Sequence, residues 1–412
     1  MTKRLLFLAH RIPYPPNKGD KIRAWHMLDH LLRDWEVDLG CLVDDPADLA
    51  HLPYLRGLCA TVRHGVIEAG SRFGRALRGL RPGQPISLGW FRDAGLAAWV
   101  REGLAAGRYD AVFVYSSAMA PYVLGPEAQG TRRVLDMVDV DSEKWLAYAA
   151  GARMPMRHIW AREARTLLAF ERRIAAAFDH TLLVSHEEAA RFLELAPGSA
   201  GRVGWVANGV DLEHFDPGLI TANPYAGTAP AIVFTGTMDY RPNVEAVTWF
   251  ADEVLPALRA RHVHAPDFHI VGARPTGVVR ALANRPGVHV TGAVPDTRPY
   301  IAHAALAVAP LRIARGIQNK VLEAMAMERP VVASPEAFEG VQACPGRDLL
   351  VADGADATIE RIGEVLDGQH ARLGAAARVA VAAGHDWRAT LRRLDAVLAP
   401  VDAGPVPAEA LS

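Results

Sequence analysis

The chain alternates short apolar runs with longer amphipathic stretches, and this alternation occurs twice. Strand-like runs in the first half are separated by helix-like stretches, of which Lys21–Asp34 and Ala161–Phe178 are the clearest. The second half restarts the pattern after Pro230. The predicted strands are Arg4–Ala9, Val37–Val43, Ala111–Tyr115, Arg133–Val138, Thr181–Ser185, Ala231–Thr235, Asp267–Val271, Val288–Thr291, Leu306–Leu311 and Val331–Ala333. Two such series predict an α/β protein with two doubly wound, Rossmann-like domains.

The predicted boundary between the domains lies near Asn208-Gly209, because Asn-Gly is a strong turn signal. The stretch from Asn223-Pro224 to Pro230 then marks the start of a new unit. We therefore expect an N-terminal domain over 1–207 and a C-terminal domain over 208–384. A last helix over 385–401 and a frayed tail over 402–412 complete the chain.

Composition narrows the class of protein. The 412 residues suffice for two cores, and 22% charged residues is ordinary for a globular enzyme. A net charge of -1 argues against nucleic acid as the main partner. Cys41, Cys59 and Cys344 are scattered without metal spacing, which favours reduced thiols in a cytoplasmic protein. The first apolar run, Leu5–Ala9, is too short for a membrane span, so we interpret it as a strand.

The segment Ala305–Ser334 carries the strongest chemical signal. An apolar run leads into a polar loop with Arg312, Arg315 and Gly316, and a helix-forming run over Ile317–Glu328 follows. In open parallel sheets, ligands bind at the carboxyl ends of the strands, where this loop is expected. Two guanidinium groups, a glycine and the free N–H groups of a helix start suit an anion.

Lys320 and Glu323 fall on one face of that helix, together with Gly316. The lysine would neutralise a phosphate, and the glutamate would accept hydrogen bonds from ribose hydroxyls. The alternative is an exposed ion pair that stabilises the helix by about 0.2–0.5 kcal/mol. Spacing alone does not separate the two.

The sequence of this segment resembles the donor-sugar motif of the retaining GT-B-fold glycosyltransferases, a family that includes sucrose synthases and phosphatidylinositol mannosyltransferases. Leu322–Ala326 (Leu-Glu-Ala-Met-Ala) and Pro330–Val332 (Pro-Val-Val) match that motif. The resemblance implies that Glu323 binds the nucleotide ribose. The family usually has a sugar-facing glutamate where this chain has Arg315, and the Pro310–Arg312 loop resembles a subgroup without it. The donor sugar therefore stays open.

Other short motifs of the family occur in the same order along this chain. They include the hinge Asn208–Asp211 and the loop after the strand that begins the second domain. Thr237 and Pro242 stand where many relatives carry an arginine and a lysine, so Arg312 and Lys320 are the catalytic candidates that would stabilise the departing diphosphate. The donor-binding residues implied by the resemblance are Gly236, Thr237, Gly272, Arg315, Gly316, Ile317, Gln318 and Glu323.

A stiff loop with three prolines precedes Gly19 and resembles the glycine-rich loop that lies beside the reaction centre in this family. Its candidate acceptor contacts are Gly19, Asp20 and Arg23. A plain connection between a strand and a helix is the alternative interpretation.

Several carboxylates follow the strand that ends at Val138, in a region that resembles the family's histidine-aspartate loop. Asp139 stands at the aspartate position, and Val138 replaces the histidine. Asp139 or Asp141 would orient or deprotonate the acceptor hydroxyl. Alternatively, Asp141 or Ser142 only caps the following helix. The Asp-x-Asp spacing is typical of metal-dependent transferases of another fold, and the GT-B resemblance leads us to expect no metal.

Positive charge dominates between Arg63 and Arg108, where apolar side chains are interleaved with basic ones. A basic amphipathic patch of this kind suits the anionic inner face of a membrane, and a solvated helix face is the alternative. The arginines that recur at every third residue are Arg72, Arg75, Arg78 and Arg81.

We therefore expect a cytoplasmic, retaining hexosyltransferase without a cofactor. Its partners would be a nucleotide diphosphate sugar and a glycan or lipid-linked glycan acceptor, with no nucleic acid. Val138–Trp145 and Arg315–Lys320 resemble bacterial transferases of exopolysaccharide and PEP-CTERM/exosortase loci. The alternatives are a catalytically idle GT-B assembly subunit and a nucleotide-sugar epimerase. No G-x-G-x-x-G follows the first strand and no Walker-type loop is present, which disfavours a dinucleotide dehydrogenase and a P-loop enzyme.

Overall fold

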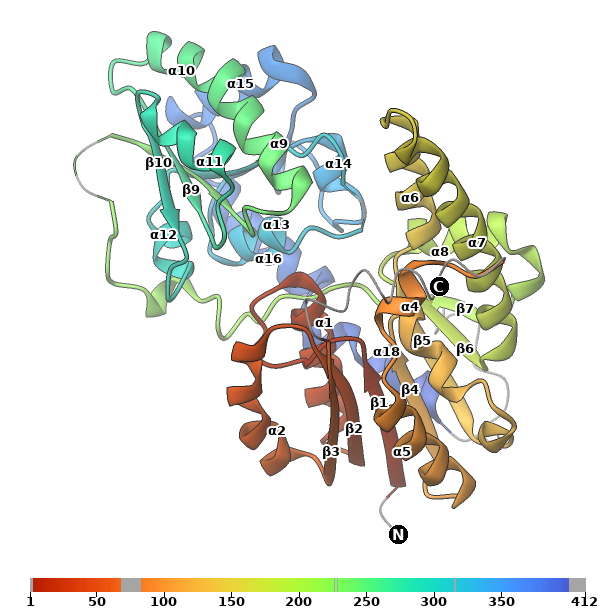
Figure 1. The fold of residues 1–412 in the computed structure, drawn as a ribbon. Helices are drawn as coiled ribbons and strands as arrows, with labels where there is room; N and C mark the ends of the chain where they lie inside the picture. The colour runs from red at the N-terminus through yellow and green to blue at the C-terminus, as the bar shows by residue number, and fades with distance from the viewer. Residues whose placement is uncertain (1–2, 68–82, 226, 228, 315, 400–412) are drawn as a thin grey trace. The chain divides into compact units, whose positions relative to one another are not determined.

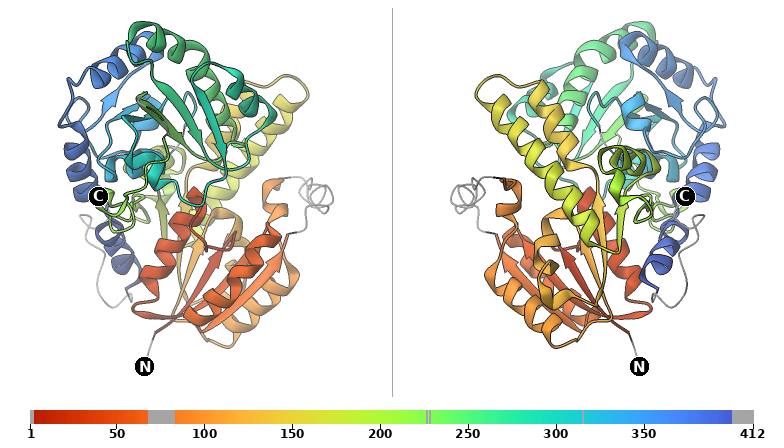
Figure 2. Two further views of the ribbon diagram at one scale, coloured as in Figure 1. Left: turned by 90° about the vertical axis from the view of Figure 1, so that its left-hand side faces the viewer. Right: turned by 90° about the vertical axis from the view of Figure 1, so that its right-hand side faces the viewer.

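The computed structural model describes residues 3–67, 83–225, 227, 229–314 and 316–399. The chain divides into two compact units. Unit 1 consists of the described residues of Met1–Ala207 and Leu391–Ser412, and unit 2 consists of those of Asn208–Thr390. Each unit is a parallel sheet with helices on both faces (Figures 1 and 2).

Unit 1 contains a seven-stranded sheet in the order β3-β2-β1-β4-β5-β6-β7, and all of its strand pairs are parallel. The central strands are apolar and almost fully buried, because helices cover both faces of a parallel sheet. The strands are β1 (Lys3–Ala9), β2 (Trp35–Val43), β3 (Thr61–Val66), β4 (Ala111–Tyr115), β5 (Arg132–Val138), β6 (His180–Leu183) and β7 (Val203–Trp205). The helices are α1 (Gly19–Leu31), α2 (Leu52–Leu58), α4 (Ser87–Trp90), α5 (Ala94–Ala105), α6 (Asp141–Ala150), α7 (Met156–Ala177), α8 (His186–Leu195) and α18 (Arg392–Leu398).

Unit 2 contains a six-stranded parallel sheet in the order β10-β9-β8-β11-β12-β13. Its strands are β8 (Ala231–Thr235), β9 (Asp267–Val271), β10 (Val288–Gly292), β11 (Leu306–Ala309), β12 (Val331–Ala333) and β13 (Leu350–Val351). Its helices are α9 (Arg241–Trp249), α10 (Leu255–Arg261), α11 (Gly277–Ala281), α12 (Arg298–Ala302), α13 (Asn319–Ala326), α14 (Pro335–Phe338), α15 (Gly354–Leu366), α16 (Leu373–Gly384) and α17 (Trp387–Thr390). No described helix is both long and apolar enough to span a bilayer.

The predicted two series of strands and helices are present. Among the elements that the pattern missed are β3, β7 and β13. The first is interrupted by Arg63 and His64, and the other two are only three and two residues long, so they carry little apolar signal. The helix expected over 385–401 is instead two short helices, α17 and α18, and the chain passes from unit 2 to unit 1 between them.

His385 joins the beginning and the end of unit 2. Its Nε2 accepts a hydrogen bond of 2.9 Å from the backbone N–H of Gln342, so the ring proton lies on Nδ1 and is donated to the Asn208 carbonyl at 2.9 Å. The ring is fully buried, and burial lowers its pKa. The neutral His385 ring therefore links the end of unit 2 to the Asn208-Gly209 segment at its beginning.

Unit 1 is organised around a buried ion pair between α1 and β5. Arg23 is 1% exposed and Asp136 is fully buried. Two charge-assisted hydrogen bonds join them, Nε to Oδ2 at 2.7 Å and Nη2 to Oδ1 at 3.0 Å, and Nη1 donates to the Val206 carbonyl at 2.8 Å. The acceptor role expected of Arg23 stays a prediction, and these contacts favour a structural role.

We predict that Asp136→Ala lowers the free energy of unfolding by about 3–5 kcal/mol, because it leaves the buried Arg23 guanidinium without its counter-charge. The matched control is Asp29→Ala, which removes an exposed pair between Asp29 on α1 and Arg33 just beyond the end of that helix, and it costs about 0.5 kcal/mol or less. Urea unfolding of both variants tests this. Equal losses in the two variants would contradict it.

Candidate functional site

The carboxyl edge of the six-stranded sheet brings two glycine loops into close contact. Gly272 follows β9 and has φ 150°, and a Cβ built on it would lie 1.8 Å from the carbonyl oxygen of Gly236, which follows β8. Gly236 itself has φ 154°, and its Cβ would lie 2.7 Å from Nδ2 of Asn243. Only glycine fits at both positions, so the sequence sets the approach of the two loops.

Lys320 on α13 points back to these loops. Its Nζ donates a hydrogen bond of 2.6 Å to Oδ1 of Asn243 and lies 4.0 Å from the ring centroid of Phe234. Asn243 in turn donates to the Thr237 carbonyl at 3.0 Å. Helix α13, strand β8 and the start of α9 are thereby connected through one ammonium group. Burial lowers the pKa of Lys320 to about 7.

Glu323 lies one turn further along α13. Burial raises the pKa of its carboxyl to about 7, against the opposing charge of Lys320. None of the ion pairs of the described residues joins Lys320 to Glu323, so the alternative of a simple exposed pair is not what the structure shows. Two partly desolvated groups of opposite charge therefore stand at the edge of the sheet, and each gains if a ligand supplies its missing partner.

The loop that leads into α13 places the other donor candidates. Gly316 is buried with φ 66°, and Nε2 of Gln318 donates to its carbonyl at 3.0 Å. The helix begins at Asn319 with Gln318 as its N-cap, two residues later than the predicted start at Ile317. Ile317 is buried, and its role in donor binding stays a prediction.

The two arginines of this loop differ. Arg312 is exposed and borders a cavity of about 650 Å³ beside α9, with Val244, Trp249 and Ile313 among its lining residues. Arg315 lies outside the described residues.

In unit 1, the loop after β5 has a strained backbone. Val138, at the end of the strand, has φ 70°, a left-handed conformation that is costly for a β-branched residue. Strain of this kind persists where the surroundings impose it, and it is frequent at functional sites. The residue in this conformation stands immediately before Asp139.

Asp139 is a carboxyl group with an unusual environment. Its Oδ1 is buried without a hydrogen-bond partner. Burial raises the pKa of Asp139 to about 7, and the carboxylates of Asp141 and Glu188 add to this, while Lys144 and Arg23 oppose it. A carboxyl that titrates near neutrality can act as a general acid or base.

Two glutamates that the sequence analysis did not select complete this cluster. Oε2 of Glu188 accepts from the Val140 N–H at 3.0 Å, and Glu171 accepts from the N–H of Ser142 at 3.1 Å and from its hydroxyl at 2.5 Å. Burial raises the pKa of Glu171 to about 8. A signal existed for both. Glu171 stands on the apolar face of the predicted helix, and Glu188 is the last residue of a Ser-x-x-Glu capping pattern that begins at Ser185.

The candidate acceptor loop is held by charges of its own. Gly19 is exposed and begins α1. Asp20 pairs with Arg11 at 2.5 Å, and His10 lies 3.5 Å away. Although burial alone would raise the pKa of Asp20, His10 and Arg11 hold it well below its usual range. Asp20 is thus a fixed anion, and its contact with an acceptor stays a prediction.

Comparisons with known proteins identify the fold of the chain. Residues 229–368, most of unit 2, match the family model described as glycosyl transferases group 1. HepE from Anabaena, solved in complex with UDP, is similar with a TM-score of 0.68 at 15% identity, covering 96% of this chain and 99% of HepE. The fold is GT-B.

Other solved structures are similar to the same extent. Sucrose-phosphate synthase from Thermosynechococcus elongatus has a TM-score of 0.68 at 18% identity, covering 95% of this chain and 98% of that one. WaaG, a glycosyltransferase involved in lipopolysaccharide biosynthesis, has a TM-score of 0.64 at 16% identity, covering 96% and 99%. No curated protein sequence matches the chain.

The raised pKa of Asp139 predicts a pH-dependent effect of Asp139→Asn. The unfolded state loses this proton near pH 4, and the folded state keeps it to about pH 7, so the carboxyl destabilises the fold increasingly as pH rises between these values. The asparagine variant should therefore gain thermal stability relative to the unchanged protein from pH 4.5 to pH 8. Melting curves across this range test it, with the exposed Asp34→Asn as control. A constant difference at all pH values would contradict the prediction.

Proposed function

We propose that this chain is a retaining glycosyltransferase that moves a hexosyl group from a nucleotide diphosphate sugar to a hydroxyl of a glycan. The observation that carries the proposal is the pair of partly desolvated groups, Lys320 and Glu323, beside the loops of Gly236 and Gly272. This cluster lies within the residues that match the glycosyltransferase family model.

The chemistry assigns a role to each group. The bond from the anomeric carbon to the diphosphate oxygen breaks, and the diphosphate leaves with the electron pair. Lys320 and Arg312 stabilise the negative charge that develops there, and Glu323 accepts hydrogen bonds from the ribose. A new bond forms from the anomeric carbon to the acceptor oxygen with the original configuration, and Asp139 orients the hydroxyl or takes up its proton.

The low pKa of Lys320 fits this role. In the free protein, burial disfavours the charged ammonium. A diphosphate within hydrogen-bond distance favours the charged form and offsets that cost. The glycine loops admit the backbone of unit 2 close to such a ligand, because no Cβ stands in the way.

We predict that a nucleoside diphosphate binds this chain through these groups. Calorimetric titration with UDP, GDP and ADP should give one preferred ligand, and UDP is tested first because the similar HepE was solved with it. Lys320→Ala and Glu323→Ala should each weaken that binding by about tenfold or more, a loss of about 1.4 kcal/mol. Glu360→Ala, an exposed carboxylate on α15, is the matched control and should bind as the unchanged protein does.

The alternatives give different results in the same experiment. Binding of none of the three nucleotides would favour the idle assembly subunit. Conversion of a nucleotide sugar in the absence of any acceptor would favour the epimerase. Unchanged affinity in both variants would show that the charges are assigned to the wrong residues. For an active enzyme, the anomeric proton signals of the product test retention of configuration.

We further propose that the acceptor is lipid-linked and belongs to exopolysaccharide synthesis. The segments Val138–Trp145 and Arg315–Lys320 support a role in exopolysaccharide synthesis, because they resemble transferases of exopolysaccharide loci. The arginines first considered for membrane contact, Arg72, Arg75, Arg78 and Arg81, lie outside the described residues.

A different surface of unit 1 supports membrane contact. The turn between α6 and α7, together with the start of α7, exposes large apolar side chains, with exposures of 64% for Met154, 41% for Met156 and 42% for Ile159. Arg153 and Arg157 are exposed among them. Neither aspartate nor glutamate occurs from Lys144 to Arg162. Apolar side chains ringed by positive charge suit an anionic bilayer.

We predict that the purified protein sediments with vesicles of phosphatidylglycerol and much less with vesicles of phosphatidylcholine. The double variant Arg153→Glu/Arg157→Glu should lower the partition coefficient onto these vesicles by about thirtyfold or more, because each of the two basic side chains lost contributes about 1 kcal/mol near an anionic surface. The matched control is Arg261→Glu, a single charge reversal in unit 2. Equal binding by all three proteins would contradict a role of this turn.

A further inference from the structure

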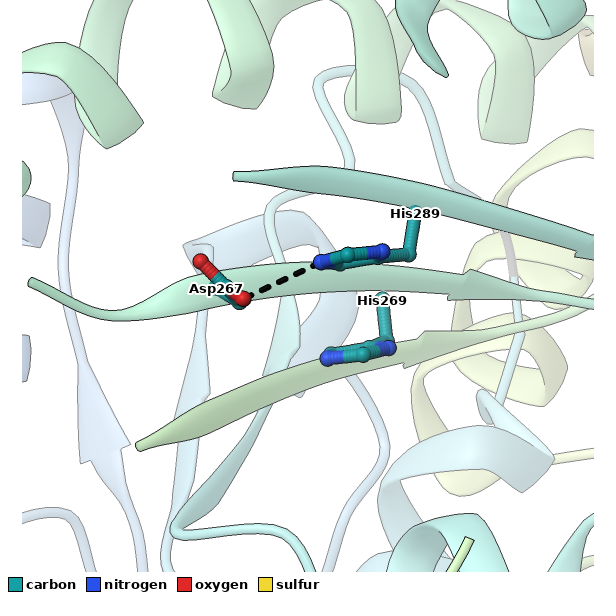
Figure 3. Close-up of side chains that lie close together, drawn as sticks. All are labelled: Asp267, His269 and His289. Carbon is teal, nitrogen blue, oxygen red and sulfur yellow. Dashed lines mark hydrogen bonds and ion pairs between the residues drawn. The ribbon is translucent and has the colours of Figure 1, made fainter. Parts of the chain in front are cut away.

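The first half of strands β9 and β10 holds three polar side chains that the proposed transfer reaction does not use. Asp267 and His269 are two residues apart on β9, so they point to the same face of the sheet. His289 on β10 is the register partner of His269. Figure 3 shows the three side chains together, with the two imidazole rings one above the other and the Asp267 carboxylate at their edge.

The ligand atoms of this trio are close to one another. One nitrogen or oxygen from each residue lies within 4.8 Å of the other two. Nε2 of His289 is 3.0 Å from Oδ2 of Asp267, and the two imidazole rings stack with centroids 4.5 Å apart and an angle of 12° between their planes. Such a stack is unfavourable for two imidazolium ions, so at least one ring is neutral and keeps a lone pair.

The surroundings hold two of the three side chains in place. Nη1 of Arg259 donates to Oδ1 of Asp267 at 2.5 Å, which fixes the carboxylate and leaves Oδ2 facing the histidines. Tyr225 packs on the His269 ring with centroids 4.5 Å apart, and its hydroxyl donates to the Tyr300 carbonyl. Partners that orient a ligand in this way are typical of metal sites.

We propose that Asp267, His269 and His289 bind a divalent transition metal ion, with Zn²⁺ as the best match to the donor set. Two imidazole nitrogens and one carboxylate oxygen are typical Zn²⁺ ligands. With bonds of about 2.0–2.2 Å, tetrahedral donors lie about 3.4 Å apart. His289, whose side chain is 51% exposed, is the ligand with room to move towards this spacing. Solvent supplies the fourth ligand.

This site is separate from the nucleotide site. Asp267 stands at the amino end of β9, whereas Gly272 follows its carboxyl end. The ion would join the edge strand β10 to β9, since β10 has β9 as its only neighbour in the described sheet. The sequence led us to expect no metal, because His289 joins Asp267 and His269 only through the pairing of β10 with β9.

The test uses the untagged chain of 412 residues after treatment with a chelator. Addition of Zn²⁺ should raise the melting temperature by several degrees, and metal analysis after desalting should find about one ion per chain. Co²⁺ in its place should give the visible absorption bands of a tetrahedral site. Mg²⁺ should have no effect, because it prefers octahedral oxygen ligands.

Two variants separate this site from unspecific binding. His289→Ala removes an exposed ligand with little risk to folding and should lower Zn²⁺ affinity by about tenfold or more. His264→Ala removes an exposed histidine three residues before Asp267 and should leave affinity unchanged. The proposal is overturned if Zn²⁺ does not bind, or if His289→Ala binds as tightly as the unchanged protein. Nucleotide binding by His289→Ala should be normal, so this test does not depend on the proposed function.

Discussion

The donor-side cluster of unit 2 depends on a close contact between two backbone loops, those of Gly236 and Gly272, at the carboxyl edge of the sheet. No Cβ fits at Gly272, because it would collide with the Gly236 carbonyl. The two loops therefore approach to a distance that only glycine permits, and the Gly236 loop is fixed in position. Asn243 then spans from Thr237 to the ammonium of Lys320. The position of Lys320, the cation of α13, thus depends on Gly236 and Gly272 having no side chain.

The buried ionisable side chains of this molecule differ in whether the protein itself supplies all of their partners. Arg23 and Asp136 are buried and are satisfied by each other and by nearby backbone groups, so the pair needs no ligand to complete its hydrogen bonds. Lys320, by contrast, is partly desolvated and hydrogen-bonds only to the neutral Asn243 side chain, and one buried oxygen of Asp139 has no hydrogen-bond partner. Burying an ionisable group without a full set of partners lowers the stability of the fold. A substrate that supplies the missing partner offsets this cost in free energy. This difference, more than charge itself, separates structural residues from candidate functional ones.

The sequence predicted the parts of the fold that depend on local pattern. Strands such as β8 and β9 have the predicted bounds, because apolar runs between polar turns leave little ambiguity. The start of α13 moved to Asn319, because Gly316 takes a left-handed conformation and Gln318 serves as the N-cap. Glu171 could not be placed beside the Asp139 loop from sequence, since its position depends on how α7 packs against α6. Pairings between distant segments are decided by tertiary structure, and no single-sequence pattern reports them.

The same reasoning explains why the metal trio escapes motif recognition while the donor site does not. Lys320 and Glu323 belong to one helix, so their spacing is itself a signal. His269 and His289 meet only because β9 and β10 pair in parallel and in one register. A shift of that register by one residue would turn His289 to the other face of the sheet and disperse the ligands. The site is therefore a property of strand register, and a metal ion bound there would stabilise the one pairing that holds this edge strand.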